Sequence, residues 1–167
     1  MANHVRDGRL DLAVLSLPKP HGRGLETVRL ASEPMMLACP PDHPLATKSR
    51  VHLATLAGAT FVDFPPGWGT RMASDLVFAA AQVDREVAFE LNDTAGVVEF
   101  ARAGLGLALL PASLLADVPD LASVAVVPRP PVFDTHLAWS KGLPRTAAVE
   151  ALRQRVIELA GGASKSR

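Results

Sequence analysis

Cysteine is nearly missing from the sequence, and neither sign of charge prevails. The 167 residues include a single cysteine, Cys39, which cannot form a disulfide within the chain and favours a reducing, cytoplasmic environment. Lysine and arginine together number 17, as do aspartate and glutamate, so the formal net charge is zero. Because binding along DNA requires a basic surface that neutralises phosphates, the chain alone is not expected to hold DNA.

Long apolar runs are missing as well. The longest nearly continuous run, from Ala103 to Ala116, contains Pro111 and is shorter than the ~20 residues that a membrane-spanning helix needs. Near the N-terminus, Arg6, Asp7 and Arg9 interrupt the apolar stretch that a secretory signal peptide would require. We therefore expect neither a membrane span nor secretion.

The sequence also lacks the motifs that indicate an enzyme or a bound cofactor. It contains no G-x-S-x-G nucleophile turn and no acid-rich cluster suited to a metal. Cys39 and His43 are four residues apart, but no second pair has the spacing of metal ligands, and the intervening prolines suit a turn. Gly104 and Gly106 lie between a helix and a strand, the reverse of the dinucleotide-binding order. We expect no catalytic residue, no metal and no cofactor.

What remains is an alternation of short apolar runs with helical spacing, which is typical of an α/β fold. Strands are predicted at residues 12–15, 35–39, 87–91, 107–110, 124–127 and 136–139. A helix capped by Thr70 places a set of apolar side chains on one face, namely Met72, Leu76, Ala79, Ala80 and Val83. A second helix starts at 92–94 and is stopped by Gly104. A third carries the apolar stripe Val149, Leu152, Val156 and Leu159 and ends at Gly161 and Gly162.

Two proline-rich segments are predicted to divide the chain into lobes. They lie at residues 40–44 and 128–131, and their hinge residues would be Pro41, His43, Pro44, Pro128 and Pro130. The first lobe would comprise residues 1–44 and 130–163, and the second residues 45–129, with a disordered tail at 164–167. A ligand would bind between the lobes.

Several motifs, in order along the chain, resemble the effector-binding domain of LysR-type transcriptional regulators. Residues 5–14 are similar to the family's helix that turns at Gly8 into a strand. Residues 33–37 and the HPLA-containing segment 41–46 resemble a strand and its crossover into the second lobe. Further matches are the loop and helix start at 67–71, the helix-to-strand turn at 103–111 and the returning strand at 138–141. The resemblance covers residues 1–160 and combines several motifs, which makes it specific.

The resemblance implies a two-lobed, type 2 periplasmic-binding-protein-like α/β fold whose first lobe is incomplete. Full-length members carry a winged helix-turn-helix, a linker helix and a first strand-helix-strand segment ahead of the matched part. DNA would be contacted only through a helix-turn-helix domain missing from this chain. The strand at 12–15 would lack a neighbour, and since unpaired strand edges recruit other strands, we expect a homo-oligomer.

The candidate ligand-binding residues surround two helix starts. Gly67, Gly69 and Thr70 precede or open a helix, where unpaired N–H groups and the helix dipole attract anions; a glycine turn with a threonine cap is the alternative. The polar residues Asn92, Asp93 and Thr94 form a helix cap and also resemble the cleft edge of the second lobe; simple capping without ligand contact is the alternative.

Four more residues complete the candidate site. Arg71 could pair with a carboxylate ligand or with Asp75 one turn later. Trp68 could close over a ligand or pack on its own lobe, and Pro65 lies in the same loop. Ser16 follows a strand and would face the cleft, or begin a turn.

Together these features favour a ligand-sensing domain that binds a small anionic metabolite, such as a carboxylate, and transmits the change to a DNA-binding domain. A freestanding solute-binding protein has the same two-lobed plan and is the main alternative. A two-lobed deaminase of porphyrin precursors is a third, but it would need a covalent cofactor anchor, and Cys39 lies in an apolar run that suits that role poorly.

Overall fold

The computed structural model describes residues 1–16 and 24–163, which fold into two compact units. Unit 1 comprises Met1–Ser32 and Asp134–Arg167, and unit 2 comprises Glu33–Phe133. The predicted tail at 164–167 lies outside the described residues. Within the described part, no helix is both long enough and apolar enough to cross a membrane.

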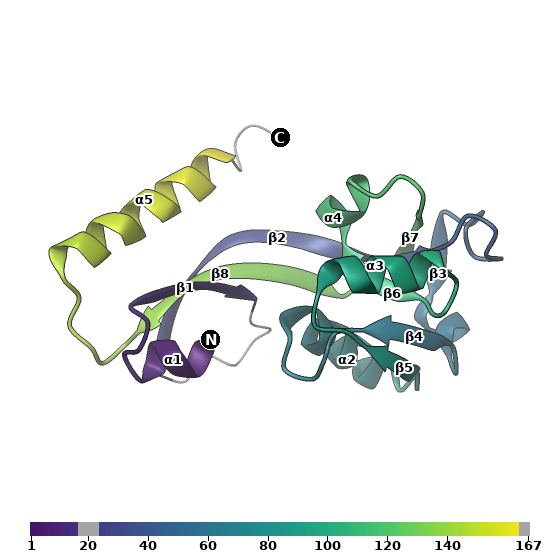
Figure 1. Ribbon diagram of the computed structural model, residues 1–167, viewed down its shortest axis with the longest axis horizontal. Helices are drawn as coiled ribbons and strands as arrows, with labels where there is room; N and C mark the ends of the chain where they lie inside the picture. The colour runs from purple at the N-terminus through teal and green to yellow at the C-terminus, as the bar shows by residue number, and fades with distance from the viewer. Residues whose placement is uncertain (17–23, 164–167) are drawn as a thin grey trace. The chain divides into compact units, whose positions relative to one another are not determined.

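Unit 1 is a small sheet with one short and one long helix (Figure 1). Its elements are α1 (Ala2–Arg6), β1 (Leu12–Ser16), the first part of β2 (Leu25–Cys39), most of β8 (Val132–Ser140) and α5 (Ala147–Ala163). In the sheet β8 lies between β1 and β2, and β1 pairs antiparallel with it from Leu12↔Trp139 to Ser16↔Thr135. Strand β1 therefore has a paired edge and an edge that no described strand covers.

The core of unit 1 is small, and α5 contributes no buried residue to it. It consists of Val5, Ala13, Leu25 and Ala138. None of residues 147–161 is buried, and Leu152 and Leu159 of the predicted apolar stripe are 57% and 58% exposed. The prediction that Gly161 and Gly162 end this helix is wrong, because α5 continues through them to Ala163.

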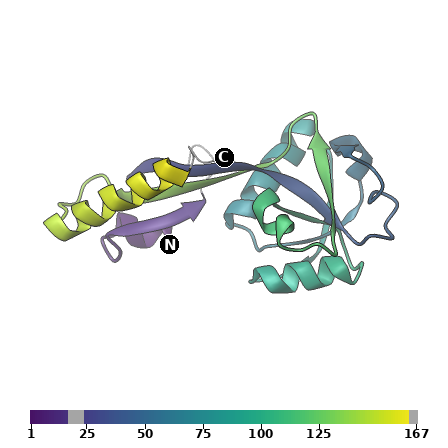
Figure 2. The same ribbon diagram turned by 90° about the horizontal axis from the view of Figure 1, so that it is seen from above.

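Unit 2 is a larger sheet with helices on both faces (Figure 2). Strand β2 pairs antiparallel with β6 (Ala108–Pro111) on one side and β7 (Ala122–Val127) on the other, and β7 pairs parallel with β3 (Arg50–His52). Strands β4 (Thr60–Asp63) and β5 (Glu86–Glu90) form a parallel pair. The helices are η1 (Leu53–Leu56), α2 (Gly69–Ala81), α3 (Thr94–Arg102) and α4 (Ala112–Ala116).

Gly106 allows the parallel pair to join the larger sheet. Leu107, just before β6, accepts a hydrogen bond from Val62 N and donates one to Thr60 O, each at 2.9 Å. A Cβ at position 106 would lie 2.9 Å from both Phe61 C and Val62 N, so only glycine fits without moving backbone. Strands β5, β4 and β6 thus follow one another as neighbours.

The alternation of side chains along β4 separates two cores. Phe61 packs with Ala73 and Phe78 of α2, whereas Val62 packs with α3. The helix predicted from residues 92–94 is confirmed, because α3 buries Val97, Val98 and Ala101 as its apolar spacing requires. Gly104 follows it with φ of +71°, in agreement with the predicted stop.

Helix α2 buries a different face from the one its apolar residues indicate. Its buried residues are Thr70, Ala73, Ser74 and Phe78. Of the predicted apolar face, Leu76 is 51% exposed and Ala79 and Ala80 are exposed too, whereas Met72 is half-buried and Val83, just beyond the helix, packs against the core. The large ring of Phe78 packs edge-on against Phe61 at 5.6 Å between centroids, and this contact decides the orientation of the helix.

The predicted hinge residues all lie within unit 2, whereas the chain passes between units inside β2 and β8. Both strands are long enough to contribute to each unit, which is why the boundary falls at 32/33 and 133/134 and not at the prolines. In the first proline-rich segment, His43 Nδ1 accepts a hydrogen bond from Leu45 N at 3.2 Å, which stabilises a turn. A hinge role for Pro41, His43, Pro44, Pro128 and Pro130 stays a prediction.

Candidate functional site

The candidate site lies at the carboxyl ends of β4 and β5 in unit 2. Because these strands are parallel neighbours, the segments that follow them emerge at the same edge of the sheet. The segment after β4 leads into α2, and the segment after β5 leads into α3. The sheet thereby brings together the two helix starts that the sequence singled out.

The loop before α2 is anchored by stacked aromatic rings. Trp68 stacks on Phe64 with ring centroids 5.2 Å apart and 14° between planes, yet remains 42% exposed. Gly67 has φ of +91°, which suits glycine, and Pro65 is half-buried beside it. Packing of Trp68 on its own unit is therefore confirmed, while contact with a ligand stays a prediction.

Thr70 does not cap α2, contrary to the sequence prediction. The N-cap is Trp68, whose side chain makes no capping hydrogen bond, and Thr70 is the second residue of the helix. Its carbonyl oxygen accepts a hydrogen bond from Ser74 Oγ at 3.0 Å. Thr70 is only 8% exposed, and within the described structure its buried Oγ1 has no hydrogen-bond partner. A hydrogen-bond acceptor placed beside this buried hydroxyl would offset the cost of its desolvation.

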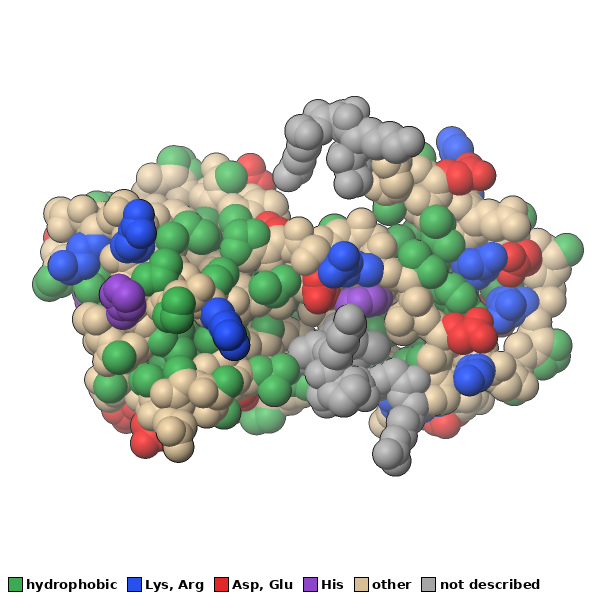
Figure 3. Space-filling model, turned by 180° about the vertical axis from the view of Figure 1, so that it is seen from behind, with side chains coloured by type: hydrophobic (Ala, Val, Ile, Leu, Met, Phe, Trp, Pro, Cys, Tyr) green, Lys and Arg blue, Asp and Glu red, His purple; other side chains and the backbone are tan. Residues whose placement is uncertain are grey.

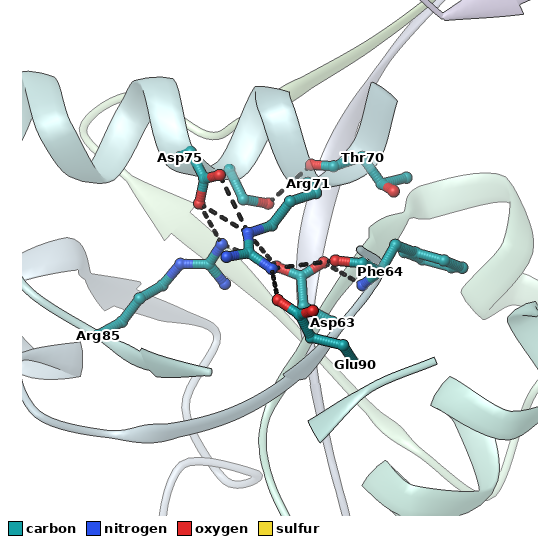
Figure 4. Close-up of polar contacts among 8 residues, drawn as sticks. Asp63, Phe64, Thr70, Arg71, Asp75, Arg85 and Glu90 are labelled. Carbon is teal, nitrogen blue, oxygen red and sulfur yellow. Dashed lines mark hydrogen bonds and ion pairs between the residues drawn. The ribbon is translucent and has the colours of Figure 1, made fainter. Parts of the chain in front are cut away.

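Arg71 is committed to acceptors of its own unit (Figure 4). Its Nε donates to Asp75 at 3.0 and 3.1 Å, and its Nη1 donates to Glu90 Oε1 at 2.8 Å and to Phe64 O at 3.1 Å. The predicted pairing with Asp75 is thus confirmed. The contact with Glu90 joins the start of α2 to the end of β5, so Arg71 holds the two halves of the site together.

Behind Arg71 lies a buried ion pair that the sequence reasoning missed. Arg85 is 2.7 Å from both Asp63 Oδ2 and Asp75 Oδ1, and the side chains of Arg85 and Asp63 are 5% and 3% exposed. Burial raises the pKa of Asp63, while the Arg85 guanidinium opposes that shift. Arg85 also lies over the rings of Phe61 and Phe78, at 5.1 and 5.0 Å from their centroids.

The start of α3 is closed by its own cap. Asp93 Oδ1 accepts a hydrogen bond from Gly96 N at 2.7 Å, which confirms the capping prediction. Asn92 and Thr94 on either side are exposed. Ser16 belongs to unit 1, where it ends β1 and pairs with Thr135, and its contact with a ligand stays a prediction.

The charged and polar groups at this edge of the sheet are suited to binding a ligand. Three carboxylates face two guanidinium groups in the network of Asp63, Arg71, Asp75, Arg85 and Glu90. Among the described residues, no three histidine, cysteine, aspartate or glutamate side chains are grouped to hold a metal. Cys39 is buried, and burial, with a smaller effect of Asp42, raises the pKa of its thiol, which makes it a poor nucleophile.

The chain is similar to known proteins over most of its length. The family described as LysR substrate binding domain matches residues 1–161. The uncharacterized HTH-type transcriptional regulator YybE of Bacillus subtilis (strain 168) is 29% identical over 157 residues, 94% of this chain and 53% of the relative. The DNA-binding transcriptional dual regulator OxyR of Escherichia coli (strain K12) is 32% identical over 155 residues, 89% of this chain and 50% of the relative. The chain thus spans about half the length of these relatives.

Solved structures show the same fold. The regulatory domain of CcmR from Synechocystis PCC6803, in complex with 2-PG, has a TM-score of 0.83 and 21% identity, covering 95% of this chain and 77% of that one. The effector binding domain of QuiR, in complex with shikimate, has a TM-score of 0.84 and 17% identity, covering 96% and 77%. The predicted type 2 periplasmic-binding-protein-like fold is confirmed. The family and these relatives are those of transcriptional regulators and not of enzymes, and the chain belongs to the LysR substrate-binding domain family.

Proposed function

We propose that this chain is the ligand-sensing part of a LysR-type transcriptional regulator and that it binds a small anionic effector, such as a carboxylate, at the start of α2. The observation that carries the proposal is the buried Oγ1 of Thr70, which has no hydrogen-bond partner among the described residues and lies in the first turn of a helix whose N-cap side chain makes no capping hydrogen bond. The domains of CcmR and QuiR that share the fold were solved with 2-PG and with shikimate.

The anion would be held by the helix start and not by Arg71. The guanidinium of Arg71 already donates to Asp75, Glu90 and Phe64 O. The first-turn N–H groups at Gly69 and Thr70, the Thr70 hydroxyl and the helix dipole remain to face an anion. Gly67 and Trp68 would border the ligand on the loop side, and Pro65, Asn92, Asp93 and Thr94 would complete the edge formed by β4 and β5.

Sensing requires that the effector bind two conformations of the domain with different affinities, since only this difference shifts their populations. We place the regulator in the cytoplasm and propose that it acts on DNA through a helix-turn-helix domain and as a homo-oligomer. Two features support assembly: the edge of β1 that no described strand covers, and the exposed outer face of α2. Figure 3, which views the molecule from behind, shows hydrophobic side chains gathered on that face of unit 2.

The test is a calorimetric titration of the chain with shikimate and a series of simple carboxylic acids. Replacing Thr70 by valine keeps the side-chain shape and removes the hydroxyl, which should weaken binding about 10-fold or more, as loss of a hydrogen bond to a charged group does. Thr60→Val, at an exposed position on β4, is the matched control and should leave affinity unchanged. Equal affinity of wild type and Thr70→Val, or a preference for cationic ligands, would refute the proposed site.

A further inference from the structure

Unit 1 contains a second group of polar atoms that the site at α2 does not use. His136 on β8 is 8% exposed, and its buried Nδ1 has no hydrogen-bond partner within the described structure. Asp134, two positions earlier on the same strand, has a buried Oδ1 that likewise lacks a hydrogen bond among the described residues. A buried polar atom that stays desolvated and unpaired destabilises the folded state.

The strand register places these two side chains on one face of the sheet. His136 pairs with Leu15, and Ala138 pairs with Ala13. Residues directly opposite in an antiparallel pair point to the same side, and residues two apart on a strand do so as well. Asp134, His136 and Ala138 therefore share the face on which α1 packs, and the polar pair lies beyond the apolar cluster of Ala13 and Ala138.

A cationic side chain from the neighbouring strand reaches the same place. Arg29 on β2 has its Nη1 at 3.9 Å from Asp134 Oδ1, too far for a hydrogen bond but close enough for electrostatic attraction. The side chains of Arg29 and Asp134 are 61% and 24% exposed, whereas His136 is buried. Exposure thus falls from the guanidinium through the carboxylate to the imidazole.

From these three residues we infer a second binding site, on unit 1, for a small α-hydroxy acid. The ligand hydroxyl donates a hydrogen bond to Asp134 Oδ1, and the ligand carboxylate pairs with Arg29. The carboxylate oxygen that lies deeper in the site contacts Nδ1 of His136. Arg29 Nη1 and Asp134 Oδ1 are only 3.9 Å apart, which suits ligand groups on adjacent carbons. A hydroxyl fits better than an ammonium group, because an ammonium group at Asp134 would lie next to the Arg29 guanidinium and be repelled by it.

The experiment is an NMR titration of the full chain that follows the ring nitrogens of His136 and the amides of Leu15, His136 and Ala138. Lactate, glycerate and malate are the probes, propionate and succinate are their counterparts without the hydroxyl, and alanine replaces the hydroxyl of lactate by an ammonium group. We expect the hydroxy acids to shift these signals. The counterparts without the hydroxyl, and alanine, should bind at least about 10-fold more weakly, in keeping with the loss of one charge-assisted hydrogen bond.

Variants separate the contacts. Asp134→Asn should weaken lactate binding about 10-fold. Arg29→Gln, at a position whose side chain is 61% exposed, should abolish the preference for lactate over its neutral amide. Asp11→Asn, an exposed aspartate of the same unit, is the control and should change neither.

Three outcomes overturn the inference: no hydroxy acid shifts His136, which would assign the two atoms to bound water; propionate shifts it as strongly as lactate; or alanine binds as tightly as lactate. Each is independent of the proposed effector site, because Thr70→Val, the variant that tests that site, lies in unit 2 and should leave the His136 response intact.

Discussion

Arg153 lies over the ring of Trp139, with its guanidinium carbon 4.9 Å from the ring centroid, and this contact holds α5 to β8. The same ring donates from Nε1 to Glu26 Oε2 at 2.6 Å, so it also joins β8 to β2. Glu150, one turn before Arg153 on α5, accepts hydrogen bonds from Arg153 and from Arg145, which lies 5.8 Å from the Trp139 centroid. Since no residue from 147 to 161 is buried, this polar and cation–π cluster is the main attachment of the helix.

Arg153→Leu should therefore loosen α5 more than its exposed position indicates. The substitution removes both the contact with Trp139 and the ion pair with Glu150, so the amides of α5 should exchange with solvent several times faster. Hydrogen-exchange mass spectrometry measures this directly. Arg155→Leu is the control, because Arg155 lies on the same helix, is 67% exposed and pairs with Glu158; equal acceleration in both variants would contradict the attachment.

The attachment of α5 should also weaken in acid. Hydrogen bonding from Arg153, aided by Arg145, lowers the pKa of Glu150 from 4.5 to about 2. A carboxylate whose pKa is lowered by folding stabilises the folded state above its unfolded pKa, and that stabilisation is lost as pH falls from 4.5 towards about 2. Protection of the α5 amides should decline over this range, and in Glu150→Gln this pH dependence should disappear.

Gly106→Ala should destabilise the protein by about 1–3 kcal/mol, because its Cβ would collide with backbone and not with a flexible side chain. The atoms in question are Phe61 C and Val62 N, each 2.9 Å away. Gly142→Ala is the control, since a Cβ there meets nothing within 4 Å. The stabilities of the two variants are measured by urea denaturation. Equal stability would contradict the close approach of β4 to residue 106.

Helix α2 offers a matched pair of substitutions on its two faces. Phe78→Ala should cost about 3–5 kcal/mol, as loss of a buried ring does. Leu76→Ala, 51% exposed, should change stability by no more than about 0.5 kcal/mol. The reverse order in thermal denaturation would mean that the apolar pattern of the sequence, and not the observed packing, orients this helix.

Arg85→Met should lower stability by about 3–5 kcal/mol, because it leaves the carboxylate of Asp63 buried without its partner. The double variant Arg85→Met/Asp63→Leu should recover most of this loss, since an apolar pair can replace a buried ion pair. Failure of the second substitution to restore stability in urea denaturation would show that Arg85 acts through Phe61 and Phe78 alone.

The features that sequence reasoning predicted correctly rest on local signals. The cap of α3 needs only Asp93 and the residues after it, and the pairing of Arg71 with Asp75 needs only helical spacing. Both were therefore predictable from a few consecutive residues, and so were the strands β1, β6 and β7 to within a few positions.

The features that it missed depend on distant residues. Arg85 lies between Asp84 and Glu86, in a segment that looks like solvated surface, and its burial follows only from the ion pair with Asp63 across the β4–β5 pair. The outward face of α2 was misassigned because helical spacing reveals which apolar residues align but not that Phe78 finds a partner in Phe61. The length of β2 depends on strands that lie far along the chain.

The order in which the chain is made differs from the order in which it can fold. Unit 1 consists of Met1–Ser32 and Asp134–Arg167, and its hydrogen bond from Trp139 to Glu26 joins residues 113 positions apart. On the ribosome, unit 2 has all of its residues once Phe133 has been added, whereas β1 must wait for β8 before it gains any strand partner described here. Strand β1 thus meets the one strand partner described for it only after all of unit 2 has been synthesised.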